Sequence, residues 1–549
     1  MRRSILVVAA AAAVVLAVAP GALAGSWKFP PTINAPWSGE NDSAFDSPLT
    51  GAGLCRAAPF NTLVAYSATT NTDMIVGDPI NNSGASNFGC STPQNETTVA
   101  VNPTNANNVV AGANDYRVCC DFTGLNDGTG WAYYSFDGGA TWHNVLVPGL
   151  TAETGGSGNF NRIDAAGDPA MAFGPDGTLY YANIVFSRTS FASGVAVSVS
   201  HDGGISWSAP NMVSYVDSGN YFNDKEWVAA GPNGSVVVTW TSFGLGPHGA
   251  GYLSSPIVAA YSSNSGQSWS GQGSPVSDAA HPFDQGSAPA FAANGTLYVA
   301  YEGGTPSSGY SQDATIVARS TDGGSSFTNV EVGRVYDDAD CYPVYAGRQT
   351  LTGEHFRLNS YPSLSVDPAN GKLAMVWADD QGAGTCGTGG SSFSGATAAQ
   401  VKLVSGSWGS LSAPVKITSK ADKVFPSVAA RGGTIAVSYY TRDFAAKHDR
   451  ATCNWTTGSD APGVHPAPAP SSVCLDYASS SSSSRFTESR LTTQGSNPYI
   501  QFANGAFIGD YSQIALGSDG VAHPVWTDFR GNPGVTAANQ DIYTQSFRP

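Results

Sequence analysis

SFDGGATW, at residues 135–142, decides the fold, because variants of it return along the chain. They read SHDGGISW at 200–207, SSNSGQSW at 262–269 and STDGGSSF at 320–327. Each contains an Asp or Asn that can accept backbone N–H bonds across a turn, glycine suited to positive φ, and a final aromatic residue. We therefore predict four hairpin turns of one kind, with Trp142 and Trp207 as buried plugs.

A longer repeat surrounds these turns. A short apolar strand, a Gly-containing turn and a second strand ending near an aromatic residue recur seven times, as in DPAMAFGPDGTLYYAN from residue 168. The equivalent apolar positions, 58 to 86 residues apart, are Val99, Met171, Ala229, Phe291, Leu364, Val428 and Ile514. A four-stranded propeller blade with its loops needs about this much chain. We predict an all-β propeller of seven four-stranded blades, with six blades as the rival count.

The turn motif Ser-x-Asp-x-Gly-x-Thr/Ser-aromatic resembles the Asp-box of the sialidase-type β-propellers. This resemblance implies the propeller architecture. It leaves function open, since Asp-boxes also occur in propellers that only bind.

The chain divides into three predicted parts. Residues 1–24 have two arginines, an apolar run and a final Ala-Leu-Ala, which is typical of a secretory signal. Residues 25–93 form an N-terminal segment, and residues 94–549 form the propeller. The seventh blade has only residues 541–547 for its third strand, so we expect NTLVAYSA, at 61–68, to supply the fourth and close the ring.

Composition favours a secreted, soluble protein without a membrane span, and we expect a monomer. The net charge of -16 makes nucleic acid an improbable partner. The eight cysteines fall on loops that the repeat order puts on one face, together with the long insertions. We predict disulfides, with Cys341 joined to Cys386 and Cys453 joined to Cys474, and ligand binding at this looped face.

The residues expected to open the inner strands of the ring are Glu96, Asp168, Glu226, Ala288, Tyr361, Phe425 and Tyr511. The same Asp-x-Arg sequence ends the second strand of blades one and seven, which ring closure makes neighbours. It reads Asp115-Tyr116-Arg117 in blade one and Asp528-Phe529-Arg530 in blade seven, and Arg442 lies on blade six beside them. The three arginines could converge on one carboxylate ligand, provided that they are not consumed by their own aspartates. The alternative is that each Arg–Asp pair joins blades.

The sialidase resemblance implies a Tyr nucleophile activated by a Glu, with an Asp as acid/base. Gly509-Asp510-Tyr511-Ser512 looks like the nucleophile's context, which makes Tyr511 and Asp510 catalytic candidates. Glu96 or Glu226 would then be the activating carboxylate. The Arg-Ile-Pro motif that supplies the family's first substrate-binding arginine is missing, and so is an Arg after the strand that follows Glu226, where Thr241 stands.

Three aspartates of one loop, Asp337, Asp338 and Asp340, offer oxygen ligands that could gather a Ca²⁺. A solvated acidic loop tied down by Cys341 is the interpretation that we prefer, and we expect no cofactor.

Two functions of different classes follow. The first is a secreted glycoside hydrolase for an acidic, carboxylate-bearing sugar, with Tyr511 as nucleophile and Arg117, Arg442 and Arg530 as the clamp. The second is a non-catalytic secreted propeller that binds a glycan or protein through its looped face.

Overall fold

The computed structural model describes residues 63–64, 71–75, 93–118, 127–246, 252–304, 313–336, 342, 344–345, 348–351, 353–380, 398–444, 473–498, 507–530 and 540–549. The predicted signal, at residues 1–24, therefore lies outside the described residues. Within the described part of the chain, no helix is long and apolar enough to cross a membrane.

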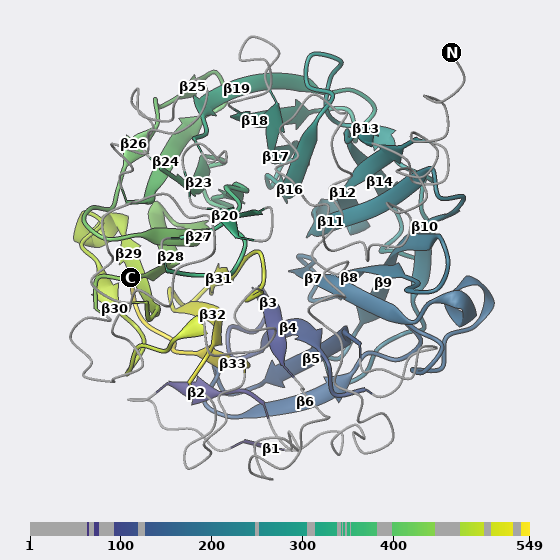
Figure 1. The fold of residues 1–549 in the computed structure, drawn as a ribbon, viewed down its shortest axis with the longest axis horizontal. Coiled ribbons are helices and arrows are strands. Elements are labelled where there is room, and N and C mark those ends of the chain that lie inside the picture. Colours follow the sequence, from purple (N-terminus) through teal and green to yellow (C-terminus); the bar gives the residue numbers. More distant parts are fainter. Residues whose placement is uncertain are drawn as a thin grey trace, which may run out of the picture.

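The described residues form seven sheets of four or five strands around a central channel, as predicted (Figure 1). Most blades run from inner to outer strand in chain order. Blade one is β3 (Gln94–Val101), β4 (Val109–Asp115), β5 (Thr129–Ser135) and β6 (Trp142–Leu146); blade two is β7 (Ala165–Phe173), β8 (Leu179–Phe186), β9 (Ala192–Ser200) and β10 (Asn211–Asp217). Blade three is β11 (Tyr221–Ala230), β12 (Val236–Leu245), β14 (Ile257–Ser262) and β15 (Ser274–Pro275), with β13 (Tyr252–Ser254) paired to β12. Blade four is β16 (Asp284–Phe291), β17 (Leu297–Gly304), β18 (Asp313–Ser320) and β19 (Thr328–Arg334).

The later blades have shorter outer strands. Blade five is β22 (Ser363–Val366), β23 (Leu373–Asp379) and β24 (Gln400–Ser407), edged by β25 (Ser410–Leu411) and β26 (Val415–Lys416). Blade six is β27 (Lys423–Arg431), β28 (Thr434–Thr441), β29 (Asp476–Ser481) and β30 (Ser489–Arg490); blade seven is β31 (Gln513–Leu516), β32 (Ala522–Asp528) and β33 (Asp541–Thr544). The small hairpin β20 (Val344–Tyr345) and β21 (Arg348–Gln349) lies in the connection before blade five.

The apolar core lies between neighbouring blades. Side chains of β8, β9, β12 and β14, for example, form one buried cluster that joins blades two and three. Alternating strand residues face the two neighbouring sheets, so most positions of the inner three strands are buried, except in β22 and β31, where most are only partly buried. This packing holds the inner strands rigidly around the channel.

The ring closes through the N-terminal segment, but not through the predicted residues. The fourth strand of blade seven is β2 (Thr72–Asp73), which pairs with β33. Part of the predicted stretch, β1 (Leu63–Val64), instead extends the outer edge of blade one by pairing with β6. Both short strands cover an outer edge that would otherwise be open.

The four repeated turns share one hydrogen-bond pattern. In the first, Ser135 Oγ donates to Asp137 Oδ1 (2.7 Å), and the backbone N–H and hydroxyl of Thr141 donate to the same carboxylate (2.8 and 2.6 Å). Gly138 and Gly139 adopt φ of 72° and 87°, which glycine tolerates without strain. In the third turn Asn264 replaces the Asp and accepts the same backbone bond, from Ser268 (3.0 Å).

The aromatic residues of these turns are not equally buried. Trp142 is fully buried between blades one and seven, and its Nε1 donates to the Gly139 carbonyl (3.1 Å). Trp207 is only half-buried, with its ring 5.5 Å from that of Tyr181, so its predicted full burial is wrong. The Trp207 ring packs against the buried cluster between blades one and two from its edge.

We expect the contribution of the blade-four turn to protein stability to depend on pH. Hydrogen bonds from Ser326 and Ser320 hold the pKa of the exposed Asp322 carboxyl at about 2, below its usual value of 3.8. Since these bonds favour the ionised form, their contribution is complete above pH 3.8 and is lost as the pH falls toward 2. Asp322→Asn should remove this dependence, because an Asn already occupies the position in blade three.

The measurement is the melting temperature of both proteins between pH 2 and pH 7. The wild type should be the more stable protein at pH 7, and the difference should shrink as the pH falls below 3.8. A difference that stays constant with pH would show that the Asp322 charge does not hold the turn.

Candidate functional site

Five inner strands carry a β-bulge at one equivalent position near their start. The register shifts between Asn95/Thr98 in β3, Gly167/Ala170 in β7, Asp224/Trp227 in β11, Gln285/Ala288 in β16 and Val424/Ser427 in β27. The first bulged residue has a positive φ in each: Glu96, Asp168, Lys225, Gly286 and Phe425, at 49° to 68°. Four of these are not glycine, at a cost of about 1–3 kcal/mol each, and such strain concentrates at functional sites.

The bulges correct the predicted alignment of the inner strands. Lys225, not Glu226, is equivalent to Glu96 and Asp168, and Gly286 replaces Ala288 in the ring. The residue predicted from the sequence lies one position too late in β11 and two positions too late in β16. The reason is that a bulge adds a residue that simple alternation does not anticipate.

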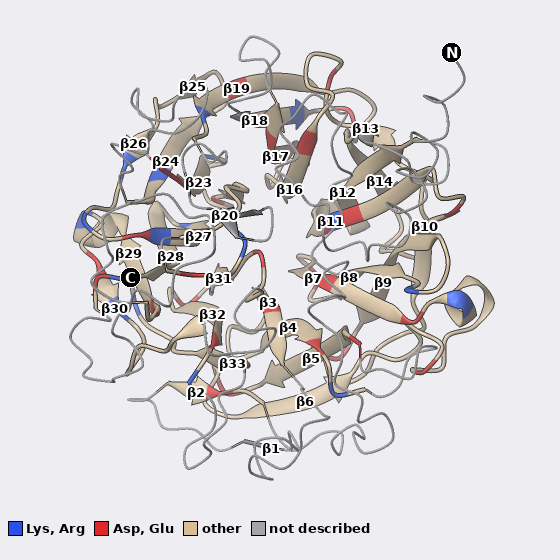
Figure 2. Ribbon diagram, viewed as in Figure 1, with Lys and Arg blue, Asp and Glu red and all other residues tan. Residues whose placement is uncertain are grey.

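Lys225 is the centre of a buried ion cluster. Its Nζ contacts Glu96 Oε1 (3.0 Å) on blade one, Asp168 Oδ1 (2.9 Å) on blade two and Asp510 Oδ2 (2.7 Å) on blade seven. The Lys225 side chain is only 4% exposed, and these contacts tie three blades to a fourth across the channel. Figure 2 shows the acidic and basic segments of β3, β7 and β11 facing the channel.

Asp510 also receives an arginine from outside the blades. The Nε and Nη2 atoms of Arg357, which precedes blade five, donate to its two carboxylate oxygens, and Asn359 Nδ2 donates to its carbonyl (2.9 Å). Burial alone would raise the pKa of the Asp510 carboxyl, but Arg357 and Lys225 outweigh it and hold the pKa below its usual value. Asp510 is therefore ionised at neutral pH, and its role as a catalytic candidate stays a prediction.

Further side chains pack into the channel beside this cluster. The Tyr361 ring lies so close to the backbone of blade four that a Cβ at Gly286 would be 2.3 Å from Tyr361 Cγ. The segment around Arg357 is buried, and its Glu354 reaches across to Arg442 of blade six (2.8 Å). These contacts join the connection before blade five to its neighbours around the channel.

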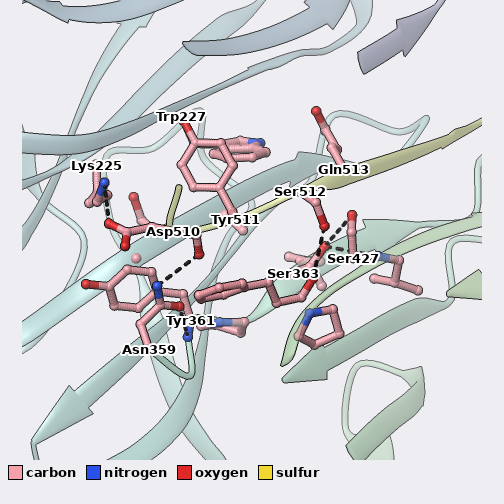
Figure 3. Close-up of a pocket in the computed structure, with 18 of the residues that line it drawn as sticks. Lys225, Trp227, Asn359, Tyr361, Ser363, Ser427, Asp510, Tyr511, Ser512 and Gln513 are labelled. Carbon is pink, nitrogen blue, oxygen red and sulfur yellow. Dashed lines mark hydrogen bonds and ion pairs between the residues drawn. The ribbon is translucent and has the colours of Figure 1, made fainter. Parts of the chain in front are cut away.

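A pocket lies in the channel next to this cluster (Figure 3). It holds about 680 Å³, including the solvent at its mouth, and runs from Lys225 and Asp510 toward Leu364 and Val428. Its lining residues come from blades three to seven. In blades five and six they run along the inner strand from Tyr361 to Leu364 and from Phe425 to Val428, toward the face with the repeated turns. Side chains farther along, such as Ser365 and Ala515, are partly exposed, which leaves this direction accessible to solvent.

The pocket combines aromatic walls with small polar groups. The Trp227 and Tyr511 rings meet edge to face, with centroids 5.1 Å apart and an interplanar angle of 74°. Tyr361 lines another wall, and burial raises the pKa of its phenol, with Asp510 adding to the shift. Hydroxyl and amide groups complete the lining, from Ser287, Asn359, Ser363, Ser427, Ser512 and Gln513.

The predicted catalytic residues lie around this pocket in different environments. Tyr511 and Glu226 both line it, and the Tyr511 hydroxyl donates to the Pro169 carbonyl (3.2 Å). Glu96 accepts from Lys225, from the backbone N–H of Asp510 (3.1 Å) and from Asn114 Nδ2 (2.8 Å). Glu96 is thus engaged by three donors of the protein.

The predicted clamp arginines are engaged by carboxylates of the protein. Arg117 Nη2 contacts Asp115 Oδ2 (2.7 Å) with both side chains fully buried, and its guanidinium stacks 4.0 Å from the Trp131 ring centroid. Arg530 forms a bidentate pair with Asp528, at 2.7 Å for both bonds.

Arg442, the third, is paired with Glu354 (2.8 Å) and Asp422 (3.2 Å). An anion clamp requires guanidinium groups that are not paired with carboxylates of the protein itself. The three arginines do not meet this requirement. The competing interpretation, in which each Arg pairs with its own Asp and joins blades, holds only in its first part: Arg117 and Arg530 pair with the Asp two residues earlier in the same blade, whereas Arg442 pairs with Glu354 and Asp422.

Lys225 and Arg357 were not predicted as site residues. Lys225 could have been found, because it occupies the same repeat position as Glu96 and Asp168. Arg357 lies in a connection between blades that has no repeat, so no sequence pattern indicates it. Asp337, Asp338 and Asp340 lie outside the described residues, and so do all cysteines except Cys474. Cys474 is buried and disulfide-bonded, while its predicted pairing with Cys453 stays a prediction.

No protein-family model matches the chain, and no curated protein matches it either. Solved structures do resemble it. A protein of unknown function from Dyadobacter fermentans has a TM-score of 0.40 and 14% identity, over 70% of this chain and 94% of that chain. The Penicillium chrysogenum α-L-arabinanase complexed with arabinobiose has a TM-score of 0.40 and 14% identity, over 69% of this chain and 94% of that chain.

The Trypanosoma rangeli sialidase gives a TM-score of 0.39 and 14% identity, over 70% of this chain and 58% of that chain. Identities at this level are too low to transfer an activity or a residue role to this chain.

Proposed function

We propose that the channel pocket binds a neutral sugar residue and that the protein recognises glycans through it. The observation that carries the proposal is the pocket's lining: the Trp227, Tyr511 and Tyr361 rings beside a set of hydroxyl and amide groups. Aromatic rings provide large rigid surfaces for the apolar faces of a sugar, and the polar groups can bond its hydroxyls.

Charge favours a neutral ligand over an acidic one. The described residues of the ion cluster and pocket wall include the carboxylates of Glu96, Asp168, Glu226 and Asp510, against the cations Lys225 and Arg357. Both cations already contact carboxylates, so neither is left to neutralise a carboxylate ligand. An acidic sugar would therefore enter a site of like charge.

Glycoside hydrolysis is the second candidate, favoured by the presence of Tyr511 and Glu226 in the wall of one pocket. In this proposal Tyr511 is the nucleophile and Glu226 the base that takes its proton. The Asp-box resemblance does not choose between the two candidates, since Asp-boxes also occur in propellers that only bind. Secretion by the signal at residues 1–24 also belongs to the proposal, because glycans are abundant outside cells.

We expect Trp227→Ala to weaken the binding of a neutral glycan about tenfold or more, since it removes one aromatic wall. Calorimetric titration with neutral and acidic oligosaccharides measures this. Trp269→Ala is the matched control, because Trp269 is a partly buried tryptophan that does not line the pocket. Tighter binding of a sialic or uronic acid than of any neutral sugar would contradict the proposal.

The same protein, tested with fluorogenic neutral and acidic glycosides, separates binding from hydrolysis. Turnover by the wild type that is lost in Tyr511→Phe would support the enzyme. Binding without turnover would support a glycan-binding propeller that does not catalyse hydrolysis.

A further inference from the structure

A second concave site lies on the outer side of the ring, between blades four and five. Its groove holds about 890 Å³, including the solvent at its mouth. One wall is β19, through Thr328, Val330 and Glu331, and the other is the β24–β25 hairpin, through Trp408 and Ser412. Neither wall contains a residue of the channel pocket.

Trp408 has an unusual place among the aromatic residues of the blade turns. In the first four blades the aromatic residue follows the turn, but in blade five Trp408 lies in the turn itself, between the paired Ser407 and Ser410. Gly409, at φ 83°, permits this tight turn. The Trp408 ring lines the groove and remains partly exposed.

The neighbours of Trp408 hold its ring in place. The Tyr298 ring centroid lies 5.9 Å away, and the Arg319 guanidinium carbon lies 5.6 Å from the indole centroid. A cation already placed near this ring opposes a second cation over the indole. The indole therefore offers a flat, apolar surface in the groove.

Glu331 supplies an oriented acceptor in the same groove. His281 contacts it through Nε2 (3.3 Å) while its Nδ1 contacts Asp278 (2.8 Å), so the imidazole bridges the two carboxylates. The His281 side chain is 8% exposed, whereas that of Glu331 is 54% exposed. The carboxylate is thus restrained by a buried partner and still accessible to a ligand.

We propose that this groove is a second saccharide-binding site, which stacks a neutral sugar ring on Trp408 and accepts its hydroxyl protons at Glu331. A sugar ring offers an apolar face and hydroxyl donors at its edge, which matches a fixed indole beside a carboxylate. Thr328 and Ser412 add hydroxyl groups, and Val330, which is 42% exposed, adds apolar surface.

The groove lies on the side of the ring toward which the channel pocket extends. Thr328 directly follows the repeated turn of blade four, and Trp408 occupies the corresponding connection of blade five. A neutral glycan is the ligand class that we propose for the channel, and in this respect the inference rests on the proposed function. The two sites share no residue, so they can be tested separately.

The test is calorimetric titration of the purified full chain with soluble neutral hexasaccharides of glucose, xylose, mannose, galactose and arabinose. We expect Trp408→Ala to weaken binding of one of them about tenfold, and Glu331→Gln about threefold. Trp269→Ala is the control, because it truncates a partly buried turn tryptophan outside both sites. Melting temperatures of all variants separate lost binding from lost packing.

Each outcome decides between the sites. Weakening in Trp408→Ala and Glu331→Gln, with unchanged affinity in Trp269→Ala, supports the groove. Unchanged affinity in Trp408→Ala together with loss in Trp227→Ala overturns the groove and leaves the channel proposal standing. The reverse pattern supports the groove and overturns the channel proposal. Equal losses in Trp408→Ala and Trp269→Ala, or no binding of any hexasaccharide by the wild type, overturn the inference.

Discussion

Replacing Lys225 with methionine is expected to lower the free energy of unfolding by about 3–5 kcal/mol, the range for removing one partner of a buried ion pair. The loss arises because Glu96, Asp168 and Asp510 would keep their charges in a buried site without the cation that they share. Urea unfolding followed by tryptophan fluorescence measures it. Part of the loss should disappear at acid pH, where the carboxylates can neutralise by binding protons.

Lys372→Met is the control, because it removes an exposed lysine and should change stability by no more than about 0.5 kcal/mol. A Lys225→Met protein within 1 kcal/mol of the wild type, by the same measurement, would contradict the view that this cluster stabilises the ring by joining four blades.

Truncating Trp142 to alanine is expected to cost about 3–5 kcal/mol, as for other fully buried tryptophans. The ring fills the contact between blades one and seven, where the two ends of the propeller meet, so its loss opens a cavity at the closure. The half-buried Trp207 should cost less, about 1–2 kcal/mol on the same truncation.

Phe136→Ala is the matched control, because Phe136 belongs to the same turn as Trp142 but is 44% exposed. It should change stability by about 0.5 kcal/mol or less. Equal losses in Trp142→Ala and Trp207→Ala would mean that burial does not set the contribution of these turns.

The fold could be predicted because its signals are local. A turn such as that of residues 135–142 carries its own hydrogen-bond partners, glycines and aromatic residue, so its meaning does not depend on distant parts of the chain. The strand that closes the ring has no such signal. Thr72–Asp73 is a two-residue strand, and its place follows from where the N-terminal segment meets β33.

The site was harder to predict because it depends on single-residue offsets and on contacts between blades. The bulge in β11 moves Lys225 to the position where simple alternation put Glu226. The two Asp-x-Arg steps were correctly matched as equivalent, but whether a guanidinium binds its own Asp or a ligand is decided by burial, which the sequence did not show. Arg357 reaches Asp510 across 153 residues of chain, beyond any local pattern.

The most direct test of glycan recognition in the channel is a crystal structure of the protein with the best-binding neutral oligosaccharide. We predict a sugar ring in the channel pocket, against Trp227 and Tyr511, with hydroxyl groups bonded to the polar side chains of the lining. A ligand bound instead by Arg117 or Arg530 on the looped side, with the channel pocket filled only by solvent, would contradict the account.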